Sequence, residues 1–250
     1  MEEIDIVEIS KNILERLITI GYEKNSLVSS GQLIFPTKSN DKRISEQELR
    51  QLFIEEFKML HNEFDRVLYY SIETPTTGKY SFTNDSKKLK VGDNLNTGQS
   101  ALIDLCVFKH EKENYKRILN IEFKHKNATH NNISKDILKL MHEEQNGAFI
   151  LLLKNTDNGT LKSVFKKLSN SFVEHKANWK LDKNIQLVIL SLEEKREESE
   201  VGTPFLMYRK IIKSDLRDLN KVFLLKTDSK ESVTTVCEKN DWTVKYKFKI

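Results

Sequence analysis

Two neighbouring stretches of the chain carry residues that can perform metal-dependent chemistry. Asp104 stands in the middle of the apolar run SALIDLCVF, and Glu122 and Lys124 stand in the apolar run RILNIEFK. An aspartate inside such a run is costly to bury unless it has a partner. A divalent cation is such a partner, because Mg²⁺ takes oxygen ligands, often one or two carboxylates completed by water and a substrate phosphate. The pattern therefore predicts a Mg²⁺ site formed by two carboxylates, with an ammonium group beside it.

The period of two along a β-strand determines which of these side chains share a face. Glu122 and Lys124 lie two residues apart, so they are expected on one face of a strand over residues 117–124. In the other run, Ile103, Leu105 and Val107 are expected on one face of a strand, and Asp104 on the opposite face with Leu102 and Cys106. The charged connector KHEKENYK between the two runs favours an antiparallel hairpin. The two carboxylates are therefore expected on adjacent strands.

In such a site each residue has a distinct role. Asp104 and Glu122 hold the cation, and the carbonyl oxygen of Phe123 can add a ligand; Mn²⁺ is expected to substitute for Mg²⁺. The ammonium of Lys124 would lower the pKa of the metal-bound water, orient it, or stabilise the charge of the phosphorane. The residues alone leave an alternative, in which the two acids form ion pairs with Lys124 or another cation on a solvated sheet face.

The elements that must position these residues follow from hydrophobic periodicity. Helices are predicted over residues 6–20, 45–60, 132–144 and 160–179, and strands over residues 67–72, 100–108, 117–124, 148–153 and 185–192. Ser45 and Glu48 form a capping box at the start of the second helix, and Gly147 is expected as the C-cap of the third. Residues 73–99 are expected to form a long loop or hairpin, and the segments FLMYRKII, VFLLK and WTVKYKFKI to be strand-like.

This order predicts an α/β fold in which a mixed central β-sheet is flanked by helices on both faces. No linker rich in Pro and Gly and no internal repeat interrupts the chain. Residues 1–250 are therefore expected to form a single domain, with a core at roughly residues 44–192 and decorations at both termini.

The acid of one apolar strand, followed by Glu-x-Lys in the next, resembles the motif of the PD-(D/E)xK nuclease superfamily, whose fold is restriction-endonuclease-like. The core order of that superfamily, α-β-β-β-α-β, matches the order predicted from Ser45 to Leu153. The residue before the motif aspartate is Ile103 rather than proline. The resemblance implies a Mg²⁺-dependent endodeoxyribonuclease, such as a restriction, repair or phage-defence enzyme. It further implies that a glutamate of the first core helix joins the metal site; that role falls on Glu48, with Glu46 and Glu56 as rivals.

Several residues around the motif are candidates for binding DNA. Lys126 follows the motif directly, and Lys135 and Lys139 lie four residues apart on the next predicted helix, where they either contact phosphates or form a solvated charged face. Gln99, just before the first strand of the motif, can hydrogen-bond to substrate or order the metal shell. The lysines and aromatic residues of the predicted loop at 74–98 suit either a flap over nucleic acid or an ordinary mobile loop.

Composition limits the class of protein without selecting a function. The net charge of +4 permits a nucleic-acid partner but does not require one, and two cysteines cannot build a disulfide framework. No run approaches the roughly 20 apolar residues of a membrane span and the N-terminus is acidic, so a cytoplasmic protein without membrane contact is expected. Small size and near-neutral charge favour a homo-oligomer or an enzyme that responds to a signal. The alternatives are a catalytically silent interaction or nucleic-acid-binding domain of the same fold, and an RNA-directed nuclease.

Overall fold

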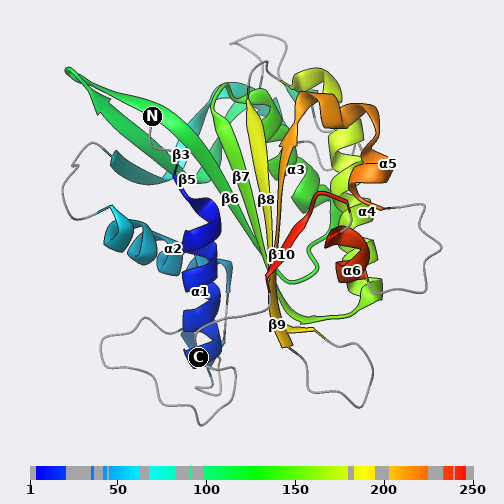
Figure 1. The fold of residues 1–250 in the computed structure, drawn as a ribbon. Helices are drawn as coiled ribbons and strands as arrows, with labels where there is room; N and C mark the ends of the chain where they lie inside the picture. Colours follow the sequence, from blue (N-terminus) through cyan, green and yellow to red (C-terminus); the bar gives the residue numbers. More distant parts are fainter. Residues whose placement is uncertain are drawn as a thin grey trace.

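A computed structural model of the 250-residue chain has the α/β architecture shown in Figure 1. It describes residues 4–20, 35–36, 42–43, 45–61, 68–82, 90–91, 98–179, 183–194, 203–224, 233–238 and 240–245. The helices are α1 (Ile6–Ile20), α2 (Glu46–Leu60), α3 (His130–His142), α4 (Asn158–His175), α5 (Leu219–Val222) and α6 (Val233–Glu238), with short 3₁₀ turns at Lys176–Asn178 and Lys213–Arg217. The strands are β1 (Phe35–Pro36), β2 (Lys42–Arg43), β3 (Leu68–Ser81), β4 (Lys90–Val91), β5 (Gln99–Glu111), β6 (Asn114–His125), β7 (Asn146–Thr156), β8 (Asn184–Glu194), β9 (Thr203–Ile212) and β10 (Thr243–Lys245).

One mixed sheet organises the molecule, with the strand order β10-β9-β8-β7-β6-β5-β3-β4. Since β4 is a two-residue pairing, seven strands of this sheet have three residues or more. Strands β6, β7 and β8 run parallel to one another, and the remaining neighbours are antiparallel. The predicted α/β fold with a mixed sheet flanked by helices is confirmed at this level.

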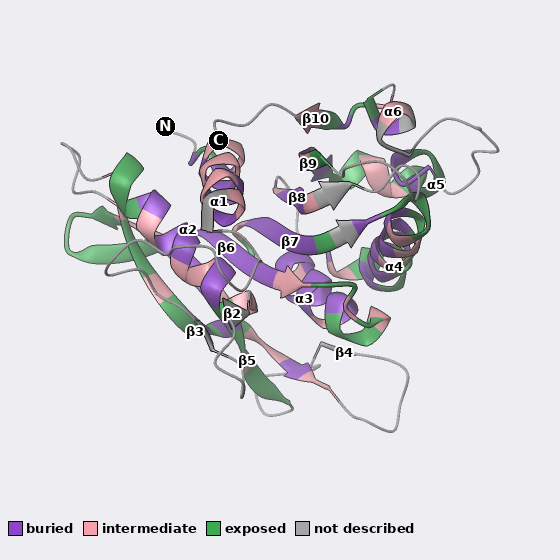
Figure 2. Cartoon of the chain, turned by 90° about the horizontal axis from the view of Figure 1, so that it is seen from below, coloured by how far each residue is buried: buried purple, intermediate pink, exposed green. Residues whose placement is uncertain are grey.

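Helices cover both faces of the sheet (Figure 1). Helices α1 and α2 pack on one face, where their apolar stripes join Leu105, Ile121 and Phe123 in a single buried cluster. Helices α3 and α4 pack on the other face, in a second cluster with Phe149 and Leu151 of β7. Because apolar side chains of β7 point into both clusters, this strand is buried on both faces, as its continuous apolar run predicted. Figure 2 shows how burial varies across the sheet: β6 and β7 are largely buried, and the outer strands are more exposed.

The predicted helices over residues 6–20, 45–60, 132–144 and 160–179 are confirmed within a few residues. The Oγ of Ser45 accepts from the backbone N–H of Glu48, as the cap of α2 requires. The prediction that Gly147 ends the third helix is wrong, because Glu143 is the C-cap of α3 and Gly147 lies in β7. A Cβ at Gly147 would come within 3.2 Å of Leu140, so the glycine allows α3 to pack closely on the sheet.

Of the loop or hairpin predicted for residues 73–99, the structure has the hairpin, since β3 continues to Ser81 and pairs antiparallel with β5 up to Gln99. Strand β3 pairs with β5 across Pro75, with a register irregularity between Pro75 and Lys79. On the other side of β3, the described pairing with β4 involves only Tyr80 and Ser81. At Pro75 no described strand pairs with that side of β3, and proline is tolerated on such an edge. Residues 83–89 and 92–97 of the predicted loop lie outside the described residues.

The antiparallel hairpin of β5 and β6 is confirmed, and it is longer than predicted. Most of the supposed connector is strand, and the turn consists of Lys112, with φ +57°, and Glu113. The segment VFLLK was predicted to be strand-like; this is wrong for its start, because Val222 ends α5 and is buried against the sheet. In the described part of the chain no helix is long and apolar enough to span a membrane.

Candidate active site

Strands β5 and β6 separate at one end of their hairpin, and we call this place the fork. The two strands pair from the turn as far as Leu105 and Ile121. Beyond that point β5 pairs with β3, while β6 pairs with β7 from Leu119 to His125. Asp104 and Glu122 are the first residues past the last pair, one on each strand. The two predicted carboxylates therefore flank the opening between the strands.

The side chain of Asp104 links the two strands across the fork. Its Oδ2 accepts a hydrogen bond of 2.8 Å from the backbone N–H of Phe123 on β6. The side chain thereby replaces the ladder bond that the separated strands no longer make. Asp104 is half-buried, so the fork remains accessible at this carboxylate.

Glu122 is fully buried under α3. Its Oε1 lies 2.6 Å from Nζ of Lys139, while its Oε2 has no hydrogen-bond partner among the described residues. Burial, together with the negative charges of Asp136 and Asp104, raises the pKa of Glu122 well above its usual range. A buried carboxylate oxygen without a partner is the atom that a bound cation would satisfy.

Lys124 connects the fork to both layers of helices. Its Nζ donates to the carbonyl oxygen of Phe123 at 2.9 Å and lies 2.8 Å from Oδ2 of Asp136 on α3 and 3.4 Å from Oε1 of Glu46 on α2. Burial opposes the charged form, but the two carboxylates outweigh it and raise the pKa of Lys124. The ammonium is therefore held charged directly beside the Phe123 carbonyl.

The glutamate that α2 contributes to the fork is Glu46. The prediction by resemblance favoured Glu48, but residues two apart on a helix lie about 200° apart around its axis and do not share a face. Glu48 is buried, and its backbone N–H serves the cap of α2. Glu56, the other rival, pairs with Arg16 of α1 at 2.9 Å. Burial raises the pKa of Glu46, and the charge of Lys124 opposes that shift.

Two charged residues of α3, Asp136 and Lys139, belong to the site; Asp136 was not predicted, and Lys139 was predicted only as a phosphate contact or as part of a solvated charged face. Lys139 is only 7% exposed, and it forms ion pairs with Glu122 and, at 3.0 Å, with Asp136. It is thus neither a surface phosphate contact nor part of a solvated face. Their spacing of three residues was the one available signal, because such residues are neighbours on a helix.

The predicted nucleic-acid contacts are distributed around the fork. Lys126 is exposed immediately after β6, two residues beyond Lys124. Lys135 is half-buried on α3, with its Nζ 5.5 Å from the centre of the Phe82 ring. Gln99 is exposed at the start of β5; since it precedes Asp104 by five residues, about 17 Å of strand separates them. Lys126 and Gln99 therefore both lie beyond the point where β5 and β6 separate, four residues past Glu122 and five residues before Asp104.

The charges around the fork do not balance. Four carboxylates face two ammonium groups, a net charge of −2 when all are ionised: Glu46, Asp104, Glu122 and Asp136 against Lys124 and Lys139. Among the described residues no group of three or more His, Cys, Asp or Glu side chains is arranged to hold a metal ion. The donor set that fits Mg²⁺ is accordingly two carboxylates and the Phe123 carbonyl, with water or phosphate in the remaining positions. Of the ion pairs in the alternative interpretation, the structure has that of Glu122, with Lys139, and this pair is buried under α3; Asp104 accepts a hydrogen bond from the backbone N–H of Phe123.

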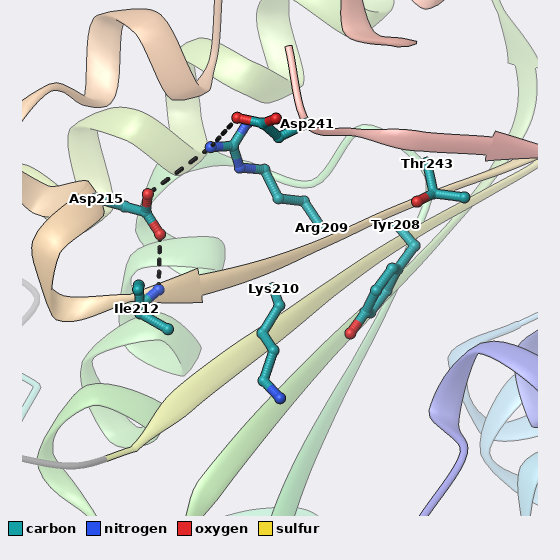
Figure 3. Close-up of a pocket in the computed structure, with 7 residues that line it drawn as sticks. All are labelled: Tyr208, Arg209, Lys210, Ile212, Asp215, Asp241 and Thr243. Carbon is teal, nitrogen blue, oxygen red and sulfur yellow. Dashed lines mark hydrogen bonds and ion pairs between the residues drawn. The ribbon is translucent and has the colours of Figure 1, made fainter. Parts of the chain in front are cut away.

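In two other groups of polar residues, the side chains pair with one another. At the far side of the sheet, a hollow of about 370 Å³ lies beside β9 and β10 (Figure 3), where the guanidinium of Arg209 lies 3.7 Å from Asp215 and 3.9 Å from Asp241. Between α3 and α4, the Oγ of Ser134 lies 2.7 Å from Nε2 of His175, but both residues are about 1% exposed. That hydroxyl is closed to substrate and joins the two helices.

No protein-family model, curated protein or solved structure matches this chain. Any function must therefore be argued from the residues of the fork and their geometry.

Proposed function

We propose that the chain is a Mg²⁺-dependent nuclease of the PD-(D/E)xK, restriction-endonuclease-like type that hydrolyses phosphodiester bonds in DNA. The observation that carries the proposal is the fork itself. Asp104 and Glu122 flank the opening of two strands, the Oε2 atom of Glu122 is buried without a hydrogen-bond partner, and the Lys124 ammonium lies beside them. With all four carboxylates ionised, a divalent cation would balance the net charge of −2.

The order of elements around the fork supports the same type of nuclease. Along the chain, α2, β3, β5, β6, α3 and β7 follow one another, and the two-residue β4 is the only described element inserted among them. This is the α-β-β-β-α-β order of the superfamily core. The acids stand on the second and third of these strands and the helix glutamate on the first helix, where the motif requires them.

The residues divide the chemistry among themselves. Asp104, Oε2 of Glu122 and the carbonyl of Phe123 would hold the Mg²⁺, which supplies a water of lowered pKa and neutralises phosphate charge. Lys124 stays protonated and stabilises the negative charge that develops on the scissile phosphate. Glu46 orients Lys124, and the exposed Lys126, two residues beyond Lys124, contacts the phosphate backbone.

A catalytically silent nucleic-acid-binding domain is the second candidate function. Two contacts favour it: Glu122 already has a cation partner in Lys139, and Asp104 already has a hydrogen-bond donor in the backbone N–H of Phe123. Such a domain would bind nucleic acid without needing the metal.

Plasmid nicking distinguishes these functions. Supercoiled plasmid, single-stranded DNA and RNA of matched sequence are incubated with the protein in Mg²⁺, in Mn²⁺ and in EDTA. Nicking of the plasmid is expected with either metal and not with EDTA. D104N and E122Q should each lower the nicking rate by more than the factor of roughly 10 to 100 that substitutions of residues next to metal ligands cost. E113Q, in the exposed turn of the hairpin, is the matched control and should keep wild-type activity. Full activity in D104N and E122Q refutes the proposal, and cleavage of RNA alone reassigns the substrate.

A further inference from the structure

The ammonium of Lys139 lies within hydrogen-bonding distance of three oxygen atoms. Its Nζ lies 2.6 Å from Oε1 of Glu122, 3.0 Å from Oδ1 of Asp136 and 2.9 Å from the carbonyl oxygen of Leu102. These three oxygens come from β6, α3 and β5. Since an ammonium group has three N–H donors, each donor has one acceptor.

Two carboxylates and a backbone carbonyl are also the ligands that a hard divalent cation takes. Phosphodiesterases that use two metals hold the ions about 3.5–4 Å apart on shared carboxylates. Here the two oxygen atoms of the Glu122 carboxylate likewise face two different positions. Its Oε1 faces Lys139, and its Oε2 has no hydrogen-bond partner among the described residues.

We infer that the Lys139 ammonium fills a second cation position of the fork, so that the site takes one divalent metal ion rather than two. The inference rests on the proposed function only for the first ion, at Asp104 and Oε2 of Glu122. The position around Lys139 is defined by its own three oxygens.

Asp136 fixes this arrangement from α3. Its Oδ1 lies 3.0 Å from Lys139 and its Oδ2 lies 2.8 Å from Lys124, so one carboxylate bridges the two ammonium groups. A lysine on a helix cannot dissociate as a metal ion can, and the second position is therefore filled at any metal concentration. Removing the ammonium would leave Glu122, Asp136 and the Leu102 carbonyl facing one another, with the net charge of the fork at −3.

The test counts bound Mn²⁺ on the full-length chain, from the free Mn²⁺ signal in electron paramagnetic resonance. Wild type is compared with K139A and K139Q. K135A is the control, because Lys135 lies one turn earlier on α3 and its Nζ faces the Phe82 ring. We expect one ion for wild type and K135A, and one additional ion for K139A and K139Q. D136N in the K139A background should remove the additional ion and keep the first.

This inference is tested by the number of Mn²⁺ ions that K139A binds beyond the number bound by wild type, and not by the total number bound. If wild type binds no Mn²⁺ and K139A binds one, the proposed metal site at Asp104 fails while the second position is supported. Two ions on wild type, or equal stoichiometry and affinity in wild type, K139A and K139Q, overturn the inference.

Folding is followed in parallel, because K139A removes the cation between two buried carboxylates. Thermal melting with and without Mn²⁺ is expected to show a larger metal-induced rise in Tm for K139A than for wild type. K139Q keeps most of the side-chain length and an N–H donor for the Leu102 carbonyl. Its metal-induced rise in Tm should also be larger than that of wild type. If Mn²⁺ stabilises neither variant more than it stabilises wild type, Lys139 is a structural lysine and the inference is wrong.

Discussion

The hydrogen bond that closes the fork allows the structural and chemical roles of Asp104 to be separated. In D104N and D104A the same charge is lost, but only asparagine retains an oxygen that can accept from the Phe123 N–H. The difference in stability between the two variants therefore isolates that hydrogen bond. Leaving a buried donor unsatisfied costs about 1–3 kcal/mol. Asp104 is half-buried and water can replace part of the bond, so we expect the lower half of that range.

The assay is thermal melting in EDTA, followed by circular dichroism. For a chain of this size each kcal/mol shifts Tm by about 2–4 °C, so D104A should melt about 2–8 °C below D104N. Both variants should also lose the rise in Tm that Mg²⁺ gives wild type, because both lack the ligand charge. Equal melting temperatures for D104N and D104A would refute the structural role of the bond. A wild-type response to Mg²⁺ in both variants would refute the role of Asp104 as a ligand.

Three further outcomes follow from the same geometry. E46Q should lower the nicking rate by roughly 10- to 100-fold, as changes around a metal shell do, while E48Q leaves the rate unchanged; the reverse order would show that the wrong glutamate of α2 has been chosen. K126A should weaken DNA binding at all sequences and reduce the slope of log K against log salt by about one, measured by anisotropy in Ca²⁺, whereas Q99A should not alter the slope. Burial raises the pKa of Cys106 to about 11, so its thiol should resist a disulfide reagent at pH 8 until the chain is denatured, and rapid labelling of the native protein would contradict this burial.

The strands of the fork were predictable because their signal is local. An apolar run with alternating side chains identifies a strand and its faces, and Glu122 and Lys124 share a face whatever the rest of the chain does. The charged connector between two such runs then leaves few arrangements other than a hairpin. These two features bring Asp104 close to Glu122, and they correctly predicted the carboxylates that flank the opening.

The helix residues of the site were harder to predict because their signal is tertiary. Whether Glu46 or Glu48 reaches the fork depends on how α2 is rotated on the sheet, and the two residues lie on different sides of that helix. Lys139 was ambiguous for the same reason, since a charged residue beside an apolar stripe can face solvent or a buried acid. For residues 73–81 the prediction left a loop and a hairpin open, because Pro75 and Gly78 are typical of loops, whereas pairing of that segment with β5 decides its conformation.

Five charged residues of the fork form one alternating chain, and this links the proposed chemistry to the packing of the helices. From α2 to β6 the order is Glu46, Lys124, Asp136, Lys139 and Glu122, with each neighbouring pair 2.6–3.4 Å apart. Any shift of α3 along the sheet would move Asp136 and Lys139 together, and it would change the partners of both the Lys124 ammonium and the Glu122 carboxylate. The docking of α3 therefore controls the charge of the site, and a partner that moves this helix would alter metal binding without touching Asp104.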